Sequence, residues 1–429
     1  MGFKSRKAKE IIMVNSNGLV ARAEQVTRAI REANYFPKES VIEGLGLDAI
    51  VVLNGRKILN FASNGYLSLH NHPKVIEAAK EALIKFGFGT GGSRVTSGTQ
   101  SPHVELEQRI AQFKGHQAAV VFSTGYNTNV GVLSAIVGNT LRGVENMLGV
   151  KSGNTQIQVF SDALNHASII DGLHLARGFN RTLVVSKYSH RNMKELESLL
   201  SKSTADYKLI ITDGVFSLHG RIALVDEIVK LAHQYNAEVY VDDAHGVGVL
   251  GPTGRGTAEH FGLEKEIAFS VGTLSKALGG AGGYLVGSED LCDYLRVSSR
   301  SYMFQTAMPA SIAAGLVAAF DVIEQEPHRR IELMENASWF RKELICLGFN
   351  IFDSQTQIIP VCFFDEQKAK LAAARLEEAG IFAPPYYYPA VGLDEAEVRL
   401  NLVYGHKQEH LCKVLEVLEK VGKETGVIH

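Results

Sequence analysis

The sequence has few cysteines, and none of them are paired by spacing. Its 429 residues include four cysteines, Cys292, Cys346, Cys362 and Cys412, and no two of them have the CxxC spacing. Disulfide frameworks and zinc sites need cysteines at matched spacings, whereas isolated thiols are typical of reduced intracellular proteins. The pattern therefore favours a cytoplasmic protein without disulfides and without a bound metal.

Long blocks of like charge are also missing. The net charge is −2 at pH 7, and 21% of the residues are charged, which is ordinary for a globular protein. Proteins that bind nucleic acid or a membrane surface usually carry a concentrated basic region, so this composition argues against both partners. A small local patch for an anionic substrate is still compatible with it.

No segment has the length of a membrane span. Near the N-terminus, the apolar run at residues 11–14 is too short for the core of a signal peptide. The most apolar later stretch, residues 307–323, is interrupted by Pro309, Ser311 and Asp321. Because a spanning helix needs about 20 predominantly apolar residues, we expect no membrane-spanning helix.

Apolar segments of strand length alternate with helical segments through the middle of the chain. Strands separated by helices favour right-handed crossovers and a mainly parallel sheet, so the sequence predicts an α/β fold. Seven strands are expected, at residues 118–122, 156–160, 182–185, 208–212, 237–241, 267–271 and 283–286. Helices are expected at residues 24–33, 73–86, 192–200, 226–235, 291–295 and 307–324.

The two ends of the chain differ from this middle part. Near the front, Asn54-Gly55 separates two short apolar runs, which is typical of a two-residue β-hairpin turn. Beyond Pro327 the pattern predicts strands at residues 349–352, 357–363 and 398–403 and helices at 330–347, 367–379 and 409–423. We expect three parts: an N-terminal arm and hairpin (1–69), a large domain (70–326) and a smaller C-terminal α/β domain (327–429).

Reactive side chains follow two of the predicted strands. The strand at 237–241 is followed by Asp242 and His245, and the strand at 267–271 is followed by Thr273 and Lys276. Open α/β sheets bind their ligands at the carboxyl ends of strands. A glycine-rich stretch then follows the lysine, where the backbone can approach a ligand closely. The arrangement indicates a lysine that takes part in covalent chemistry.

The motifs around these residues resemble those of a known family. VDDAHGVG (241–248) and GTLSKALGG (272–280) are similar to motifs of the α-oxoamine synthases, pyridoxal-phosphate (PLP) enzymes of fold type I that join an amino acid to an acyl-CoA. The resemblance implies that Lys276 binds PLP covalently, that Asp242 faces its pyridine nitrogen and that His245 donates to its ring 3-oxygen. A carboxylate at that nitrogen keeps it protonated, so that the ring can accept electrons.

Further motifs extend the resemblance from about residue 57 to the C-terminus. A helix N-terminus in FSTGYNTN (122–129) would bind the cofactor phosphate. A histidine in SDALNHASIIDG (161–172) would stack on the ring and act in catalysis, and a serine in TDGVFSLHG (212–220) would hold the 3-oxygen. The resemblance implies Thr124, Gly125, Tyr126 and Thr273 at the phosphate, His166 on the ring, Ser217 at the 3-oxygen and Thr306 at the phosphate of a neighbouring subunit.

Two more residues are expected to meet the substrate. Arg399 in VRLNLVYGH (398–406) matches the family arginine that binds the amino acid's carboxylate, and a planar guanidinium suits that bidentate contact. Asn64 in SNGYLSL (63–69) is expected near the substrate. The chain departs from the usual family motifs at several positions, among them Gly65, His219, Gln305 and Glu397.

The activity implied is a Claisen-type condensation of a small amino acid with an acyl-CoA, usually with loss of CO₂, to give an α-amino ketone. Lys276 would also remove the Cα proton, which requires an amine with a lowered pKa. SDALNHASIIDG and VGKETGVI favour the glycine C-acetyltransferase branch, while FSTGY is also similar to serine palmitoyltransferases. The amino acid, the acyl length and a carrier-protein thioester in place of CoA stay open.

Two other functions are compatible with parts of the pattern. An aminotransferase on the same fold would turn over a 2-oxo acid without releasing a thiol. A regulatory PLP-binding protein would lack catalysis, which the presence of Lys276, Asp242, His166 and Arg399 disfavours. Because one phosphate contact is expected from a neighbouring chain, a C₂ homodimer with a shared active site is predicted.

Overall fold

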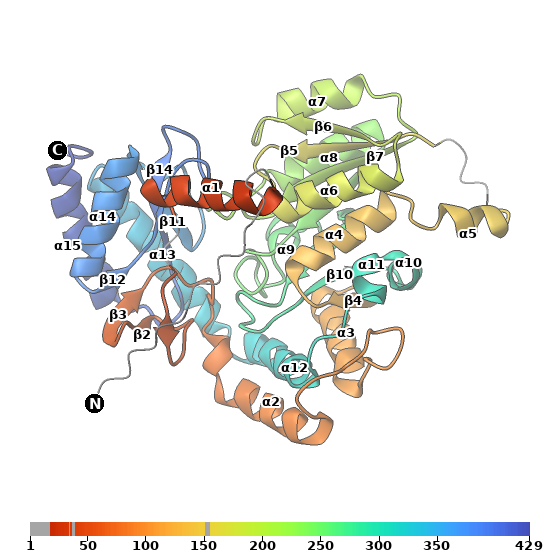
Figure 1. The fold of residues 1–429 in the computed structure, drawn as a ribbon, viewed down its shortest axis with the longest axis horizontal. Coiled ribbons are helices and arrows are strands. Elements are labelled where there is room, and N and C mark those ends of the chain that lie inside the picture. The colour runs from red at the N-terminus through yellow and green to blue at the C-terminus, as the bar shows by residue number, and fades with distance from the viewer. Residues whose placement is uncertain (1–17, 34, 37–38, 151–154) are drawn as a thin grey trace.

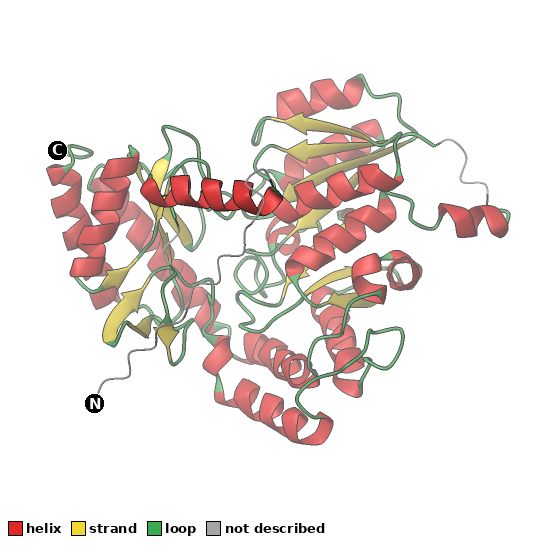
Figure 2. Ribbon diagram, viewed as in Figure 1, coloured by secondary structure: helices red, strands yellow, loops and turns green. Residues whose placement is uncertain are grey.

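One seven-stranded sheet, with helices on both of its faces, forms the larger part of the molecule (Figures 1 and 2). The computed structural model describes residues 18–33, 35–36, 39–150 and 155–429. The strand order is β4-β10-β9-β8-β7-β5-β6, in which β10 is antiparallel to both of its neighbours and the pairs from β9 to β6 are parallel. The predicted α/β class and mainly parallel sheet are confirmed. The strands are β4 (Ala118–Phe122), β5 (Ile157–Asp162), β6 (Val184–Tyr188), β7 (Tyr207–Asp213), β8 (Glu238–Asp242), β9 (Phe269–Thr273) and β10 (Gly283–Gly287).

Alternation along the strands gives this sheet two apolar faces. Leu209 and Ile211 of β7 belong to one buried cluster, whereas Ile210 between them belongs to another, because successive side chains of a strand point to opposite faces. The first cluster packs against α4 (Gly125–Ile136), α6 (Ala167–Phe179) and α10 (Glu289–Ser298). The second packs against α7 (Met193–Ser201) and α8 (Val225–Tyr235), and α3 (Ser101–Lys114) and α12 (Ala310–Gln325) cover the β4–β10 end.

The C-terminal part contains a smaller sheet with the order β11-β14-β13. Val398 and Leu400 of β14 point into the main apolar cluster together with residues of the surrounding helices. The elements of this part are β11 (Ile358–Phe364), β13 (Pro385–Tyr386), β14 (Ala396–Asn401), α13 (His328–Cys346), α14 (Glu366–Glu378) and α15 (Gln408–Glu424). A polar face of β14 is left on the opposite side, formed by Glu397, Arg399 and Asn401.

The N-terminal hairpin is joined to this C-terminal part. Strands β2 (Ile50–Leu53) and β3 (Arg56–Asn60) are antiparallel around Asn54 and Gly55, both of which have positive φ (50° and 76°), so the predicted turn is confirmed. Strand β3 also pairs in parallel with β12 (Ile381–Phe382). The division of the chain into three parts at 69/70 and 326/327 stays a prediction. The remaining elements are α1 (Leu19–Glu32), β1 (Ile42–Glu43), η1 (Leu69–Asn71), α2 (Pro73–Phe86), α5 (Arg142–Met147), α9 (Thr257–Phe261), η2 (Glu264–Glu266) and α11 (Arg300–Met303).

Two local expectations differ from the structure. The strand predicted at residues 349–352 is wrong, because Phe352 and Asp353 have positive φ (51° and 57°) and form a turn that an extended strand cannot contain. Helix α6 is not anticipated, since its glycines disfavour a helix by propensity. Gly172 instead permits close packing on α4: a Cβ there would lie 3.0 Å from the carbonyl oxygen of Asn129.

The described ranges contain neither a candidate membrane span nor a candidate metal cluster. No helix within them is long and apolar enough to cross a membrane. No group of three or more His, Cys, Asp or Glu side chains within them could hold a metal ion. The four cysteines are free thiols, with Cys292 and Cys362 buried and Cys346 and Cys412 exposed.

Candidate active site

The carboxyl ends of the central strands meet at one cavity of about 230 Å³. Strands β7, β8 and β9 end at Asp213, Asp242 and Thr273, and β4 leads into Thr124. Because these strands run in the same direction, their terminal polar residues lie at one edge of the sheet. The cavity brings together most of the predicted site residues: Thr124, Gly125, Tyr126, His166, Ser217, Asp242, His245, Thr273 and Lys276.

The amine of Lys276 lies within this cavity. Its Nζ is 2.6 Å from Nε2 of His245. Burial lowers the pKa of Lys276 to about 8, although the nearby carboxylates of Asp242 and Asp213 oppose this shift. An amine with this pKa is partly neutral near physiological pH, so Lys276 can act both as a nucleophile and as a base.

Asp242 is held by a buried network. Its Oδ2 accepts a hydrogen bond of 2.6 Å from Nδ2 of Asn129, and its Oδ1 accepts one of 3.1 Å from the backbone N–H of Ala244. The hydroxyl of Tyr240 donates to Oδ1 of Asn129 at 2.5 Å, which fixes the orientation of that amide. Asn129 and Asp242 are both almost fully buried. The carboxylate of Asp242 is therefore fixed in position at the base of the cavity.

His245 connects Lys276 to a residue that the sequence motifs did not assign. Its Nδ1 is 2.6 Å from the hydroxyl oxygen of Tyr66, a side chain with 0% exposure. Burial lowers the pKa of His245 well below its ordinary value, and the positive charges of Lys276, Arg399 and His166 add to the shift. The imidazole is therefore neutral at physiological pH. Its single ring proton is either on Nδ1 or on Nε2.

His166 lies at the opening of the cavity and precedes α6. Its side chain is exposed, and its Nδ1 accepts from the backbone N–H of Ser168 at 3.3 Å and lies 2.7 Å from Oγ of Ser168. The backbone N–H of His166 donates to Asp213 at 3.4 Å. Burial and the charge of Asp242 raise the pKa of Asp213 well above its usual range. The imidazole of His166 is thus held from one edge, with its ring left open to a ligand.

The N-terminus of α4 provides an anion site at the other end of the cavity. Oγ1 of Thr124 accepts from the backbone N–H of Asn127 at 3.0 Å and caps the helix. A Cβ at Gly125 would lie 3.0 Å from Oγ1 of Thr273, so only a residue without a side chain keeps this end open. Oγ1 of Thr273 lies 2.9 Å from Oγ of Ser275. Backbone N–H groups and hydroxyls at a helix N-terminus suit a phosphate.

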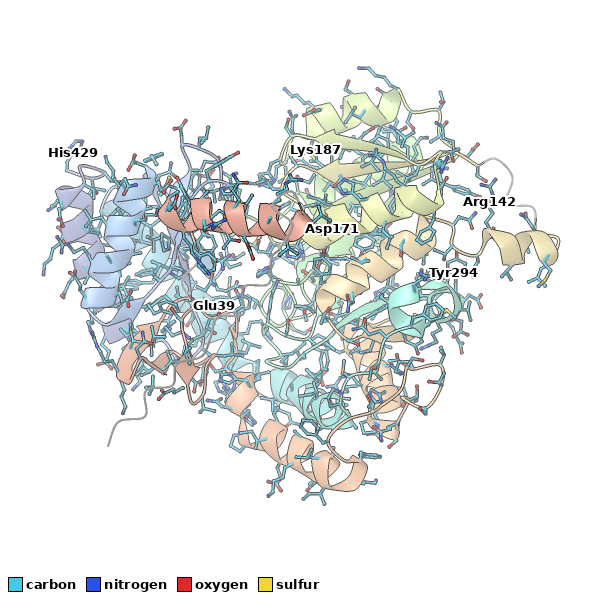
Figure 3. All side chains as sticks on the ribbon, in the orientation of Figure 1. Glu39, Arg142, Asp171, Lys187, Tyr294 and His429 are labelled. Atoms are coloured by element: carbon cyan, nitrogen blue, oxygen red, sulfur yellow. The ribbon has the colours of Figure 1, made fainter. Side chains whose placement is uncertain are left out.

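Tyr126 is only partly engaged by this site. Its side chain is 45% exposed. Its hydroxyl donates to Asp171 of α6, which is labelled in Figure 3. The ring therefore borders the cavity, while its hydroxyl is bound to the neighbouring helix.

The chemistry of these residues fits PLP. The cavity has an anion site at one end, a carboxylate at its base, a partly neutral lysine amine and an open imidazole ring. These are the groups that would hold, in turn, a phosphate, a pyridine nitrogen, an aldehyde and an aromatic ring face. The glycine at the phosphate end strengthens the fit, because a larger residue at Gly125 would meet Thr273.

Three predicted residues lie outside the lining of this cavity. Arg399 donates from Nη1 to the carbonyl of Ser217, which does line it, at 2.8 Å. Oδ1 of Asn64 lies 3.2 Å from the hydroxyl oxygen of Tyr66 and accepts from Asn401 at 3.1 Å. Thr306 is exposed, and its carbonyl accepts from Oγ of Ser123 at 3.1 Å. Their roles toward substrate or cofactor stay predictions.

Motif matching missed several residues of the site. Asn129, Asp213, Ser168 and Tyr66 all lie within the matched segments, yet none was assigned a role. The positions of two of them could have predicted a place in the site. Asp213 is the polar residue that ends β7, and Asn129 lies one helical turn beyond the Gly125 that begins α4. Tyr66 carries no such local signal, because its partner His245 is distant in the chain.

Two departures from the family motifs, at Glu397 and His219, are buried polar groups. Both carboxyl oxygens of Glu397 and both ring nitrogens of His219 lack a hydrogen-bond partner among the described residues. Burial raises the pKa of Glu397 to about 8, against the opposing charge of Arg399. Burial lowers the pKa of His219 to about 4, and Arg221 adds to that shift. Both groups are therefore largely uncharged at neutral pH.

Comparison with known proteins gives consistent matches along the chain. Residues 56–418 match the model of the aminotransferase class I and II family. The chain is 42% identical over 379 residues to 8-amino-7-oxononanoate synthase 1 of Bacillus subtilis (strain 168), which covers 88% of this chain and 91% of that protein. It is 39% identical over 401 residues to 8-amino-7-oxononanoate synthase of Thermoanaerobacter pseudethanolicus, with coverage of 93% and 96%.

Solved structures give the same result. A serine palmitoyltransferase from S. paucimobilis, solved as its K265A variant with a bound PLP-myriocin aldimine, superposes with a TM-score of 0.86 at 29% identity. That match covers 96% of this chain and 100% of the other. Serine palmitoyltransferase of Sphingomonas wittichii superposes with a TM-score of 0.84, also at 29% identity, over 97% and 100% of the two chains. The predicted fold type I architecture is confirmed by these matches.

Proposed function

The chain belongs to the PLP-dependent α-oxoamine synthases of the aminotransferase class I and II family, and from this premise we propose which substrates it joins and which residues act. It is an acyltransferase that condenses an amino acid with an acyl thioester and releases CO₂. The named relatives are synthases and acyltransferases, so the aminotransferase alternative is not supported. The observation that carries the residue roles is the meeting of Lys276, Asp242, His245 and His166 at one cavity.

The names of the relatives favour a small amino acid. 8-Amino-7-oxononanoate, the product named for those synthases, has an amino group and a ketone on adjacent carbons. Such a product forms when the Cα of an amino acid displaces the thiol of an acyl thioester and the carboxylate leaves as CO₂. Only a methyl group lies beyond its amino carbon, which corresponds to alanine. We therefore place alanine ahead of glycine and serine for this chain, with an acyl-CoA or a carrier-protein thioester as donor.

Lys276 and Asp242 are assigned to opposite ends of the cofactor, Lys276 to its aldehyde and Asp242 to its ring nitrogen. PLP, when bound, supplies an electron sink for the charge left at Cα when a bond to that carbon breaks. Lys276 holds the cofactor and then, as a free amine with a pKa near 8, accepts the Cα proton. Asp242, whose carboxyl group is fixed by Asn129, would face the ring nitrogen.

His166 and Arg399 are assigned to orientation. The open imidazole of His166 covers one face of the cavity and limits the positions a ring can take there. The guanidinium of Arg399 is anchored by its bond to Ser217 and lies 4.6 Å from the centre of the Tyr386 ring. Held in this way, its Nε and free N–H groups can bind the carboxylate of the amino acid.

We also propose that two copies of the chain form a homodimer. Phe88 and Phe304 are 90% and 71% exposed. The segments that carry them are joined, because Ser93 forms a β-bridge with Thr306 and the N–H of Ala307 donates to Gly92 at 2.9 Å. Exposed aromatic residues beside Thr306 suit an interface that brings this residue to a second cavity. The cytoplasmic location stays a prediction.

A thiol-release assay tests the proposed function. PLP-loaded protein is incubated with alanine, glycine or serine and with acyl-CoAs of increasing chain length, and free thiol and CO₂ are measured together. We expect equal amounts of both, and the highest kcat/KM with alanine. Formation of a 2-oxo acid without thiol release would support an aminotransferase instead, and a clear preference for glycine or serine would overturn the choice of amino acid.

A further inference from the structure

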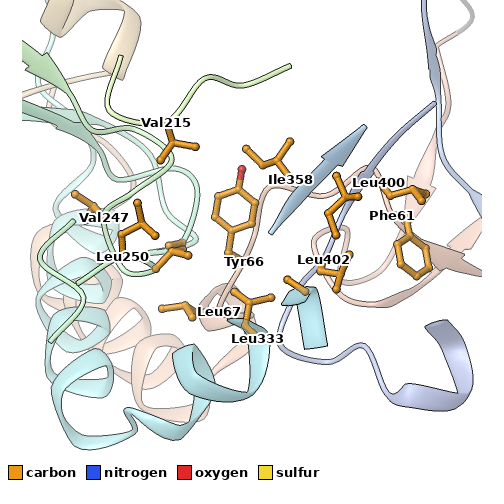
Figure 4. Packing of buried hydrophobic residues seen from close by; sticks show 14 of the residues in the cluster. Phe61, Tyr66, Leu67, Val215, Val247, Leu250, Leu333, Ile358, Leu400 and Leu402 are labelled. Carbon is orange, nitrogen blue, oxygen red and sulfur yellow. The ribbon is translucent and has the colours of Figure 1, made fainter. Parts of the chain in front are cut away.

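Tyr66 is buried between the two parts of the molecule. Its ring packs in the main apolar cluster, with Val215 and Val247 on one side and Ile358 and Leu400 on the other (Figure 4). The side chain has 0% exposure. An apolar side chain would satisfy this packing alone, so the hydroxyl is the part of Tyr66 that needs an explanation.

The hydroxyl of Tyr66 is one member of a line of hydrogen bonds. It lies 2.6 Å from Nδ1 of His245 and 3.2 Å from Oδ1 of Asn64. On one side, Asn401 donates to Asn64 at 3.1 Å. On the other side, Nε2 of His245 lies 2.6 Å from Nζ of Lys276. The line therefore runs from β14 of the C-terminal part to the reactive lysine.

Proton counting assigns a direction to the contact between Tyr66 and His245. Burial raises the pKa of Tyr66 well above its ordinary value, so the phenol keeps its single proton at all physiological pH values. Oδ1 of Asn64 can only accept, and it already accepts from Asn401. A hydrogen bond that Gln357 donates to the phenol oxygen does not use the phenol proton. Of the two possible acceptors of that proton, Nδ1 of His245 is nearer to the hydroxyl oxygen by 0.6 Å (2.6 Å against 3.2 Å). The phenol proton is therefore directed to Nδ1.

A neutral imidazole that accepts at Nδ1 must carry its own proton at Nε2. Nε2 is the nitrogen that faces Lys276 and the cavity. Burial keeps the ring of His245 neutral rather than doubly protonated, and the charge of Arg399 also opposes a further proton. When the amine of Lys276 is neutral it can accept a hydrogen bond, and this tautomer then satisfies both contacts of the ring.

We propose that Tyr66 is a positioning residue that holds His245 as its Nε2–H tautomer, so that this nitrogen donates into the cavity. This inference rests on the proposed role of His245 toward the ring 3-oxygen of PLP. Tyr66 itself does not touch the reacting atoms. It acts through His245, in the way that a hydrogen bond at one ring nitrogen fixes the state of the other.

Replacing Tyr66 by phenylalanine separates this role from packing. The substitution Tyr66→Phe keeps the ring and removes only the oxygen. A matched control is Tyr284→Phe, because Tyr284 is also fully buried, and its hydroxyl has no hydrogen-bond partner among the described residues. A general cost of removing a buried hydroxyl would affect both variants, whereas loss of the tautomer would affect only Tyr66→Phe.

The direct measurement is the ¹⁵N spectrum of the histidines in the full-length, PLP-loaded protein. In the wild type and in Tyr284→Phe we expect His245 to show a protonated Nε2 and an unprotonated Nδ1. In Tyr66→Phe we expect the two signals to move toward each other as both tautomers become populated. An unchanged Nε2–H pattern in Tyr66→Phe would overturn the proposal, whatever the activity of the variant.

The absorbance of bound PLP gives a second readout. Loss of a hydrogen bond to a charged oxygen destabilises the charged form, so the pH midpoint of the visible absorbance change should rise by about one unit or more in Tyr66→Phe. We expect kcat to fall about tenfold, with the KM for the amino acid changed less than about twofold. A midpoint equal to that of Tyr284→Phe would contradict the proposal.

A fluorinated tyrosine keeps the test valid if Tyr66→Phe fails to fold. 3,5-Difluorotyrosine at position 66 retains the ring and makes the phenol a stronger donor. It should therefore hold the Nε2–H tautomer at least as firmly as the wild type and leave the absorbance midpoint equal or lower. A rise in the midpoint with this residue would overturn the assignment. Failure of the thiol-release assay with an intact Nε2–H pattern would instead count against the proposed function alone.

Discussion

Two regions, the sheet side of the cavity and the polar face of β14 outside the cavity lining, differ in how their polar groups are satisfied. On the sheet side, Asp242, Asn129 and Tyr240 are buried and bonded to one another at 2.5–2.6 Å. On the side of the C-terminal part, the polar face of β14 includes Glu397 and Arg399. Both oxygens of Glu397 and Nε of Arg399 lack a hydrogen-bond partner among the described residues.

This difference separates two kinds of function. Buried polar groups that are fully bonded give a rigid arrangement, whereas an unbonded buried group costs about 1–3 kcal/mol of stability. The sheet side is therefore built in advance, which suits a cofactor that stays bound. On the β14 side, the free-energy cost of burying unbonded polar groups is not offset by contacts within the protein. Such groups suit a role in binding a substrate. Substitutions on the two sides should therefore have different consequences.

The largest expected effect is on the sheet side, at the lysine. Lys276→Ala removes both the covalent anchor and the base, so turnover should fall by about 10³-fold or more, while the midpoint of thermal unfolding without PLP changes little. Lys187→Ala, on the exposed surface of β6 (Figure 3), is the control and should keep full activity. Turnover by Lys276→Ala at the wild-type rate would refute the assignment of Lys276.

The next effect concerns the rigidity of the sheet side. Asn129→Ala leaves Asp242 and the hydroxyl of Tyr240 without their shared partner, so the free energy of unfolding should fall by about 2 kcal/mol, and PLP should bind more weakly. Urea unfolding and PLP titration measure the two quantities. The control Asn127→Ala lies on the same helix but contacts Gln305 instead. Equal losses of unfolding free energy and of PLP affinity in both variants would contradict the role of Asn129 in holding Asp242.

The polar face of β14 should behave differently, because the effect of a substitution there on the free energy of unfolding should depend on pH. Glu397 has a folded-state pKa of about 8, raised from the ordinary 4.5 by burial. Between these values the folded state holds a proton that the unfolded state has lost, so stability falls as pH rises from about 5 to 8. Glu397→Gln removes this dependence, and it should gain on the order of 3 kcal/mol relative to wild type between pH 5 and pH 8.

Urea unfolding at several pH values, with Asp394→Asn as an exposed control on the preceding loop, tests this expectation. The control should follow the wild type at every pH. A stability difference between Glu397→Gln and wild type that does not change with pH would show that Glu397 is ionised in the folded protein. The sheet side of the cavity and the polar face of β14 would then not differ in this respect.

The smallest expected effect concerns the exposed face beside Thr306. Phe304→Asp places a charge in the proposed interface between two copies, so the dimer should dissociate at protein concentrations where the wild type stays dimeric, with the fold unchanged. Light scattering on a size-exclusion column measures this directly. Ile331→Asp is the control, because Ile331 is also exposed (51%) but lies on α13. A monomeric wild type, or an unaffected Phe304→Asp dimer, would contradict the proposal.

The place of the sheet-side residues was largely predictable from the sequence, whereas contacts between segments distant in the chain were not. Asp242 and Lys276 follow apolar runs that could only be buried strands, so their place at one sheet edge follows from parallel topology. Tyr66 could not be assigned, because its role depends on a contact with His245 that no local pattern encodes. The same applies to the pairing of β3 with β12, which joins residues 56–60 to residues 381–382.

Local conformation explains the remaining error. Residues 349–352 have the apolar composition of a strand, yet the backbone turns at Phe352 and Asp353 with positive φ. Non-glycine residues rarely adopt such values, so composition alone favours the wrong prediction there. Helix α6 shows the converse case, in which packing of Gly172 against α4 overrides a weak helix propensity.

Reduction of the PLP-loaded protein with borohydride tests the central claim most directly. The reagent fixes a covalent link between PLP and a lysine, which peptide mass spectrometry then locates. We predict a single modified peptide, with PLP on Lys276. Modification of a different lysine, or no modified peptide after the protein has been supplied with PLP, would contradict the account.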